Sequence, residues 1–248
     1  MLLRVLEPEL MDTAEDASEY DAMDHAAVNA QFVTDLMNAI SDWSQGGWGR
    51  GSAEPPARQL AGGALTLDPN HPGINTLDLG AGTAQIPVEL ARRAPQFRIT
   101  AVDAAESMLA VGQRNTAAAG LTDRIELVLA DAKNLPFDAG TFPVVISNSI
   151  VHHIAEPQQV IAEAVRVCAP GGLLFHRDLA RPHDEELLQQ LVRNYAGEAT
   201  PYQRRLFANS LRAALALEEM EQLVSELGIA PETVRMTSDR HWTWIATK

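Results

Sequence analysis

A glycine turn between an apolar strand and a helix constrains this chain more than any other stretch. The segment TLDLGAGTAQIPVELARR occupies residues 76–93. The apolar run from Ile74 to Leu79 predicts a strand, Gly80 and Gly82 predict a tight turn, and the residues that follow have helical spacing. Such a turn lets the backbone approach a ligand closely, and the helix behind it offers free N–H groups. The alternative is an ordinary tight turn that binds nothing, because isolated glycine motifs are common.

Strands and helices alternate after this turn. Helical spacing predicts helices over 105–119 and 156–167, and Gly120 is a stop signal for the first of them. Apolar runs predict strands, after the one at 74–79, at residues 98–102, 125–129, 142–147, 173–177, 234–236 and 241–246. This alternation is typical of a parallel sheet with helices on both faces. We therefore expect an α/β fold with a doubly wound, mostly parallel sheet.

The flanking parts of the chain have a different pattern. Residues 20–40 have helical spacing, and residues 41–72 are rich in Gly and Pro, with turn signals in SQGGWGRGS and EPP. We predict that residues 1–72 form an N-terminal helical lid and connector, and that residues 73–248 form the main domain. Helical patterns over 184–195 and 202–217 predict a helical insertion at about 181–217.

Charge and cysteine content narrow the kind of protein. The net charge of −14 argues against a strong nonspecific binder of nucleic acid or of an anionic membrane. Cys168 is the one cysteine, so an intrachain disulfide is impossible. The chain has no apolar stretch of about 18 residues, and its start, MLLRVLEPEL, meets acid and proline too early for a signal peptide. We expect a cytoplasmic protein that binds neither nucleic acid nor membrane.

Three acids stand at or near the carboxyl ends of three predicted strands. They are Asp78, Asp103 and Asp131. A parallel sheet brings these ends to one edge, where an acid after the second strand can accept hydrogen bonds from ribose hydroxyls. A third acid can accept from an exocyclic amine, so the set describes a pocket for an adenosine that carries positive charge. The alternative is that each aspartate only caps the following helix.

A nicotinamide dinucleotide is a rival ligand for the same pattern. Its fingerprint needs a third glycine, where this chain has Gln85. Asp78 would also lie close to the pyrophosphate and repel it. A cationic sulfonium cofactor suits the carboxylate better.

At this point the sequence resembles the class I S-adenosylmethionine-dependent methyltransferases, in the small-molecule branch that includes quinone C-methylating enzymes. The resemblance spans roughly residues 74–178, and five segments carry it in order: LDLGAGTA, VDAAESML, ADAKNLPF, SNSIVHHI and VRVCAPGGLLFHRD. It implies S-adenosylmethionine as cofactor, S-adenosylhomocysteine as product, and methyl transfer to a small molecule by in-line displacement. It also implies a seven-stranded sheet with a reversed last hairpin, whose final strand contains TWIAT.

The resemblance implies roles for particular residues. Asp103 matches the ribose ligand, Ala104 and Met108 flank the adenine, and Asp131 faces its amine with Ala132 next to it. The other expected cofactor-binding residues are Asp78 before the turn, Gly80, Ala81 and Gly82 in it, and Asn148 and His153 after the fourth strand. Tyr20, at the start of the N-terminal helix, is a further candidate over the methionine end; the resemblance offers this role to N-terminal helices and not to a specific residue. Two features depart from the family pattern: Ala84 stands where many members have a third glycine, and the fourth strand ends in SNS instead of Asn-Pro-Pro-Tyr. The second lowers the odds for DNA or protein-glutamine acceptors.

His152 and Arg177 are the candidate catalytic residues. His152 follows the fourth strand at the expected mouth of the pocket, and an imidazole can act as a base near neutral pH; it could instead pack on the cofactor or cap a helix. Arg177 ends the fifth strand and could bind an anionic acceptor or form a salt bridge. A metal site built from His152, His153 and His176 lacks cysteine or carboxylate partners, so we predict no metal.

The sequence leaves two chemical classes open for the methyl acceptor. An anionic acceptor would be favoured if arginines fold over the mouth of the pocket. The candidate arginines are Arg177, Arg181, Arg204, Arg205 and Arg240. A flat or apolar acceptor would be favoured by an aromatic lid, for which the candidate residues are Trp48, Tyr195, Tyr202 and Phe207. An exposed N-terminal helix could also swap between the subunits of a homodimer. The rival functions are a tRNA- or protein-modifying methyltransferase, a noncatalytic S-adenosylmethionine-binding protein, and a dehydrogenase.

Overall fold

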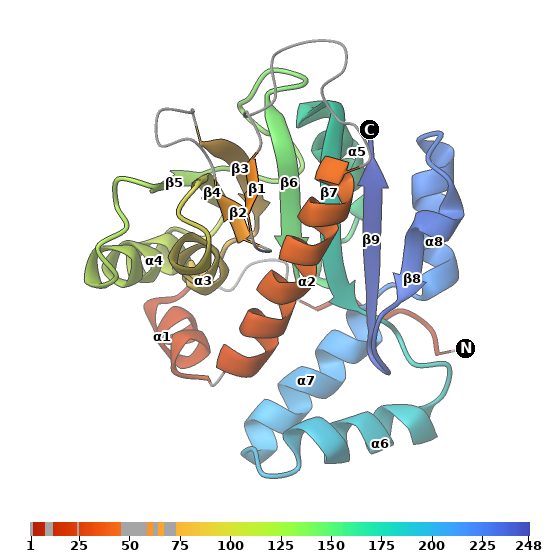
Figure 1. Cartoon of the computed structure of the whole chain (residues 1–248). Helices are drawn as coiled ribbons and strands as arrows, with labels where there is room; N and C mark the ends of the chain where they lie inside the picture. Colours follow the sequence, from red (N-terminus) through yellow and green to blue (C-terminus); the bar gives the residue numbers. More distant parts are fainter. Residues whose placement is uncertain (1, 8–11, 24, 46–58, 62–63, 67–72) are drawn as a thin grey trace.

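A seven-stranded sheet forms the centre of the molecule (Figure 1). The computed structural model describes residues 2–7, 12–23, 25–45, 59–61, 64–66 and 73–248. The strands are β3 (Ile74–Leu79), β4 (Phe97–Asp103), β5 (Ile125–Leu129), β6 (Phe142–Asn148), β7 (Cys168–Leu179), β8 (Val234–Met236) and β9 (His241–Thr247). Their spatial order is β5-β4-β3-β6-β7-β9-β8, and β9 runs antiparallel to both of its neighbours. The predicted doubly wound, mostly parallel sheet with a reversed last hairpin is confirmed.

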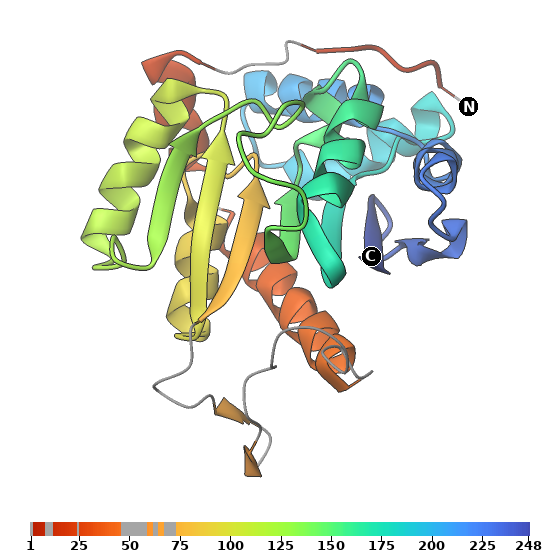
Figure 2. The ribbon, with the colours of Figure 1, turned by 90° about the horizontal axis from the view of Figure 1, so that it is seen from above.

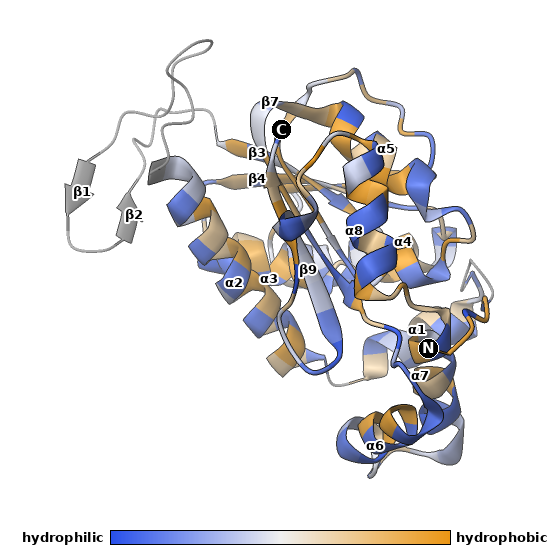
Figure 3. Cartoon of the chain, turned by 90° about the vertical axis from the view of Figure 1, so that its right-hand side faces the viewer, coloured by the Kyte–Doolittle hydropathy of each residue, from blue (hydrophilic) through white to orange (hydrophobic). Residues whose placement is uncertain are grey.

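Helices cover both faces of this sheet (Figures 1 and 2). The helices are α1 (Ala14–Ala22), α2 (Ala26–Gln45), α3 (Gln85–Arg93), α4 (Glu106–Ala118), α5 (Pro157–Val167), α6 (Glu185–Ala196), α7 (Pro201–Ala213) and α8 (Leu217–Glu226). Two single turns of 3₁₀ helix, η1 (Val151–His153) and η2 (Pro231–Thr233), and a small hairpin, β1 (Gln59–Ala61) with β2 (Ala64–Thr66), complete the described elements. Figure 3 shows hydrophobic and hydrophilic residues alternating along α2 and α6, as expected of helices with one buried side.

The two faces of the sheet have separate cores because strand side chains alternate between faces. Val144 of β6 belongs to the core under α2 and α3, whereas its neighbour Val145 belongs to the core under α5 and α8. In β7, likewise, Phe175 belongs to the core under α2 and α3, and Leu174 belongs to the core under α5 and α8. The continuous apolar runs in the sequence are therefore strands buried on both sides.

The N-terminal part differs from its prediction. One helix was expected from residue 20, but the chain forms α1 and α2 with a break at Met23. Phe32, Leu36 and Ile40 of α2 are buried in the core with Phe175 of the sheet, so α2 belongs to the helical layer. The lid remains a prediction and concerns the residues before α2. Most of the predicted connector, with EPP and Trp48, lies outside the described residues.

The Pro-Gly-Gly segment, residues 170–172, lies inside a strand, although such a segment usually marks a turn. Strand β7 already begins at Cys168, which pairs with Phe142 of β6, and the next pair is Leu173 with Val144. Four residues of β7 therefore stand opposite one residue of β6. Gly171, with φ of +77°, lies in this irregularity, which interrupts the ladder without ending the strand.

The carboxyl ends of the parallel strands face the N-terminal segment and the helical insertion. The segment of residues 2–7 crosses this edge of the molecule (Figure 2), and the Val5 amide donates to the Arg212 carbonyl at 3.1 Å. Helices α6 and α7 lie where the sequence predicts a helical insertion, and they share a small core. Among the described residues, no helix is both long enough and apolar enough to cross a membrane.

Candidate cofactor site

The glycine turn after β3 has a shape that only glycine adopts easily. Gly80 has φ of +70°, and a Cβ there would lie 1.9 Å from Cγ2 of Ile150. The amides of Gly80 and Ala81 both donate to the Val102 carbonyl at 2.9 Å, which ties the turn to β4. The backbone is thus held close to the residues that follow β6, leaving no room for a side chain.

Asp103 is fixed at the end of β4 by backbone amides. Its Oδ2 accepts from the Gly82 amide at 2.8 Å, and its Oδ1 accepts from the Ala105 amide at 2.9 Å. Burial raises the pKa of Asp103, and these amides offset part of that rise. The carboxylate therefore stands directly beside the glycine turn.

Asp78 lies deeper than Asp103 and is 2% exposed. Burial, with a smaller contribution from the Asp103 carboxylate, raises the pKa of Asp78 well above its usual range. Two neighbouring carboxylates, each with a raised pKa, make the ionised forms costly until a positive charge arrives. This part of the site is suited to a cationic ligand.

A cleft opens where β3, β4, β5 and β6 end. Its empty space is about 800 Å³, a figure that includes open solvent at its mouth. Ten of the twelve predicted cofactor-binding residues line it: Tyr20, Gly80, Gly82, Asp103, Ala104, Met108, Asp131, Ala132, Asn148 and His153. The other two, Asp78 and Ala81, belong to the strand end and the turn but are not among the lining residues.

The cleft also contains residues that the sequence did not single out. They are Ala105, Ala130, Lys133, Ser149, Ile150 and Ile154. The Nζ of Lys133 lies 3.2 Å from Oδ1 of Asp131. Asp131, the predicted acceptor for the adenine amine, therefore already has a cation beside it. Ser149, with φ of +60°, shows that the chain turns sharply directly after β6. An L-residue in this conformation leaves no clear signal in a single sequence.

Tyr20 brings α1 to the cleft. Its side chain packs with Met108 and Ala105 of the α4 region, and a Cβ built on Gly82 would lie 3.7 Å from its Cε1. Burial and the nearby carboxylates of Asp103 and Asp78 raise the pKa of Tyr20 to about 12. The phenol is therefore neutral and covers the glycine turn from the N-terminal side.

His152 and His153 have different positions. His153 lines the cleft, but His152 is 4% exposed and does not. The Nδ1 of His152 lies 2.5 Å from Oδ1 of Asp178, whose Oδ2 accepts from the Val151 amide at 2.6 Å. Burial alone would raise the pKa of Asp178, but His152 outweighs it and the pKa is lowered. Their buried ion pair holds η1 against β7.

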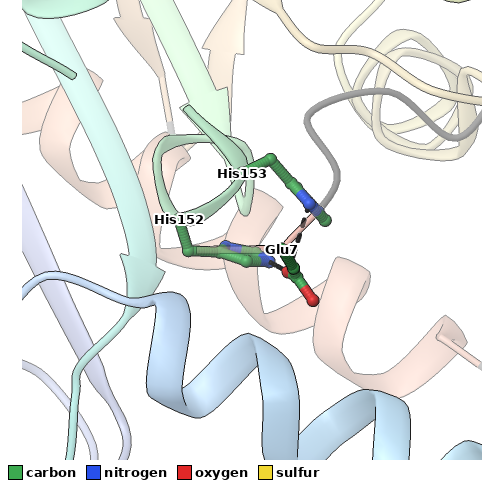
Figure 4. A group of neighbouring side chains, drawn as sticks. All are labelled: Glu7, His152 and His153. Carbon is green, nitrogen blue, oxygen red and sulfur yellow. Dashed lines mark ion pairs between the residues drawn. The ribbon is translucent and has the colours of Figure 1, made fainter. Parts of the chain in front are cut away.

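Glu7 stands against both histidines (Figure 4). Its Oε1 lies 3.6 Å from Nε2 of His152 and 3.2 Å from Nδ1 of His153. Burial lowers the pKa of His152, but Asp178 and Glu7 together outweigh it and the pKa is raised. Sequence reasoning missed Glu7 because nothing in the local pattern places it beside residues 145 positions later.

The structure does not bring Arg177 into the cleft. Its Nη2 donates to Oδ2 of Asp35 at 2.8 Å and its Nε donates to Thr243, in a separate hollow between α2 and β9. Arg181 pairs with Glu219 at 2.5 Å, and the guanidinium of Arg240 lies over the ring of Tyr195. Three of the five arginines expected to gather at the mouth, Arg177, Arg181 and Arg240, therefore contact partners elsewhere.

Comparison with known proteins agrees with this geometry. Residues 77–176 match the family described as "Methyltransferase domain". The ubiquinone/menaquinone biosynthesis C-methyltransferase UbiE of Cereibacter sphaeroides is 32% identical over 139 residues, which is 56% of this chain and 55% of that protein. The demethylmenaquinone methyltransferase of Desulfitobacterium hafniense is 31% identical over 144 residues, covering 53% of this chain and 57% of that one. The chain spans about half the length of these curated relatives.

Solved structures show the same fold over a longer stretch. A putative S-adenosyl-L-methionine-dependent methyltransferase from Methanococcus maripaludis covers 98% of this chain and 97% of its own, with a TM-score of 0.61 and 17% identity. An S-adenosylmethionine-dependent methyltransferase from Aquifex aeolicus covers 71% of this chain and 82% of its own, with a TM-score of 0.51 and 16% identity. Residues 77–176 therefore match a methyltransferase domain, and the solved structures share the Rossmann-like fold of this sheet.

Proposed function

We propose that the protein is an S-adenosylmethionine-dependent methyltransferase that acts on a small molecule. The observation that carries the proposal is the pair of buried carboxylates at the glycine turn. Asp103 is held by the Gly82 amide, and Asp78 lies beneath it with a strongly raised pKa. A cation relieves the cost of ionising both groups, whereas the pyrophosphate of a nicotinamide dinucleotide would add to it.

The residues of the cleft suggest how the cofactor lies. Asp103 would accept from the ribose hydroxyls, while Met108 and Ala132 would flank the adenine. The methionine part would follow the glycine turn under Tyr20. S-adenosylmethionine supplies an electrophilic methyl group on a sulfonium, so the protein has to align the acceptor and exclude water. Alignment alone supplies roughly 7 kcal/mol or more in well-oriented systems.

The cleft walls favour an aromatic or apolar acceptor over an anionic one. Ile150, Ile154 and Met108 line the cleft. Two of the arginines considered for an anion, Arg177 and Arg181, pair with Asp35 and Glu219 instead. The two curated relatives are named for ubiquinone and menaquinone methylation. We therefore infer a flat, aromatic acceptor.

Transfer of labelled methyl tests the proposal. The protein is incubated with methyl-labelled S-adenosylmethionine and separate acceptors: quinols, phenols, small carboxylates, tRNA and a protein mixture. We expect label in the quinols or phenols, and none in tRNA or protein. S-adenosylhomocysteine binding with no transfer to any acceptor would instead indicate a noncatalytic cofactor-binding protein.

We also propose a homodimer formed through the N-terminal segment. Leu3, Val5 and Leu6 are 86%, 56% and 53% exposed, which is unusual for neighbouring large apolar residues. Light scattering should then give about 54 kDa, twice the 26.9 kDa of one chain; a mass of one chain would refute the dimer. The cytoplasmic location stays a prediction, which fractionation of the native cells would test.

A further inference from the structure

Glu7, His152 and His153 direct three donor atoms at one small volume (Figure 4). One atom from each residue lies within 4.8 Å of the other two. Glu7 Oε1 is 3.2 Å from one imidazole nitrogen and 3.6 Å from the other. Ligands at about 2.0–2.1 Å from a tetrahedral zinc ion are separated by about 3.3 Å. The two measured separations lie on either side of that value.

Surrounding contacts hold two of the three donors, His152 and Glu7, in place. Asp178 occupies Nδ1 of His152, which leaves Nε2 directed at Glu7. A carboxylate on the far nitrogen is the usual partner of a metal-binding histidine, because it sets the ring's orientation and raises its basicity. Ser210 lies 3.4 Å from Oε2 of Glu7, and Oε1 faces the histidines.

The segment that carries Glu7 is itself anchored. Arg4 donates from Nε to the Ala213 carbonyl at 2.6 Å and from Nη2 to the Ile154 carbonyl at 2.9 Å. The side chains of Glu7 and His152 are 11% and 5% exposed, and that of His153 is 24% exposed. Glu7 and His152 are therefore largely shielded from water, and the three donor atoms are arranged before any ion arrives.

We propose that Glu7, His152 and His153 bind a divalent transition-metal ion of the zinc type. Two imidazoles and one carboxylate form a donor set that suits zinc and is poor for magnesium, which prefers oxygen ligands. The sequence alone shows no carboxylate close to these histidines, and the fold supplies one, Glu7, from the N-terminal segment. His176, which the sequence grouped with these histidines, lies beside Trp244 instead.

The ion would fasten residues 2–7 to η1. Because His153 also lines the cleft, the ion would stand at the cleft's border and help to shape the entrance for the acceptor. The last point rests on the proposed function, whereas metal binding itself does not. Binding would displace protons from the imidazoles, since histidine ligates as the neutral ring.

Calorimetry on the full chain tests the site. After treatment with a chelator and its removal, the protein is titrated at pH 7.5 with zinc chloride, and separately with magnesium chloride. We expect one zinc ion per chain with a micromolar or lower Kd, and no magnesium binding. Cobalt(II) should give the visible absorption of a tetrahedral nitrogen and oxygen site. No stoichiometric zinc binding would overturn the proposal.

Two variants separate this site from zinc bound at the surface. Glu7→Gln keeps the shape but removes the carboxylate, and should weaken zinc binding at least tenfold. His183→Ala removes an exposed histidine paired with Asp184 and should leave zinc binding unchanged. Equal affinity in Glu7→Gln and the parent would refute the assignment. Titration of both variants with S-adenosylhomocysteine keeps a failure of the cofactor site distinct from a failure of the metal site.

Discussion

Gly80 and Gly120 have nearly the same backbone angle but different surroundings. Their φ values are +70° and +68°. A Cβ on Gly80 would collide with Ile150, whereas a Cβ on Gly120 would have nothing within 4 Å. The first glycine is required by backbone angle and by space, and the second by backbone angle alone.

This difference makes the two glycines a matched pair for mutation. Gly120→Ala should lower the free energy of unfolding by about 1 kcal/mol, the cost of a left-handed alanine. Gly80→Ala should cost about 1–3 kcal/mol more, because Ile150 must move, and should also weaken S-adenosylhomocysteine binding. Urea unfolding and calorimetry measure the two effects. Equal losses in both variants would contradict the close approach at Gly80.

Asp103 is the residue whose replacement tests the proposed cofactor site most directly. Asp103→Asn should weaken S-adenosylhomocysteine binding by about 1.5–3 kcal/mol, or about 10- to 150-fold, because a charged hydrogen-bond acceptor is lost. Asp123→Asn, at an exposed aspartate after α4, is the matched control and should bind normally. An unchanged Kd in Asp103→Asn would remove its assignment as ribose ligand.

His176 links stability to pH. It is 0% exposed, and burial lowers its pKa to about 3, against about 6.5 in an unfolded chain. Unfolding therefore takes up a proton below pH 6.5, so stability from the neutral ring is present above pH 6.5 and is lost as the pH falls toward 3.

His176→Phe should remove this dependence while keeping a buried ring. Between pH 7.5 and pH 5.5, the parent should lose about 1.4 kcal/mol relative to the variant, as follows from the two pKa values. Urea unfolding of both proteins at the two pH values measures the difference. If the free energies of unfolding of parent and variant differ by the same amount at pH 7.5 and at pH 5.5, the His176 ring in the folded protein titrates like an exposed one.

At the residue scale, local pattern predicted the acids and glycines of the cleft but not the neighbours of His152 or Arg177. Asp103 and Gly82 come together because the strand ends of any parallel sheet meet at one edge. Arg177 instead meets Asp35, 142 positions earlier, and His152 meets Glu7. Those pairings depend on how the N-terminal segment packs, which a single sequence does not specify.

At the element scale, α1 shows what a weak pattern conceals. Its N-cap is Thr13, whose side chain accepts from the Asp16 amide. This capping signal was present in the sequence, but the acidic segment has little helical amphipathicity and was not predicted as a helix. Helix α2 was predicted, because its apolar spacing reflects burial against the sheet.

Removing the N-cap of α1 tests whether this helix contributes to ligand binding in the cleft. Thr13→Ala should destabilise α1 by about 0.5–2 kcal/mol, the usual cost of losing a cap, and loosen Tyr20 over the glycine turn. S-adenosylhomocysteine binding should weaken about threefold to tenfold, given roughly 0.6–1.4 kcal/mol of that loss. Thr200→Ala removes the equivalent cap of α7, away from the cleft. If both variants bind as the parent does, α1 is no lid.

Strand β7 shows the limit of turn signals. Pro-Gly-Gly usually marks a turn, and here it falls inside a strand whose register with β6 shifts. Cys168 and Leu173 both pair with β6 across that interruption. Long-range pairing decided between turn and bulge, and the local residues were compatible with both.

At the scale of the whole molecule, alternating strands and helices were enough to predict the sheet and the edge that carries the site. In the strand order, β3 lies between β4 and β6, so the glycine turn that follows β3 stands at the point where the chain's direction of winding changes. Ligands of open α/β sheets bind at that point. The N-terminal segment that crosses this edge was the part that pattern could not place.

Calorimetric titration with S-adenosylhomocysteine, with NADH as the control ligand, tests whether the cleft at Asp78 and Asp103 binds S-adenosylmethionine. We predict one site per chain with a micromolar Kd for S-adenosylhomocysteine, and no binding of NADH. Binding of NADH, or of neither ligand even with candidate acceptors present, would contradict the assignment of the two-carboxylate cleft to S-adenosylmethionine.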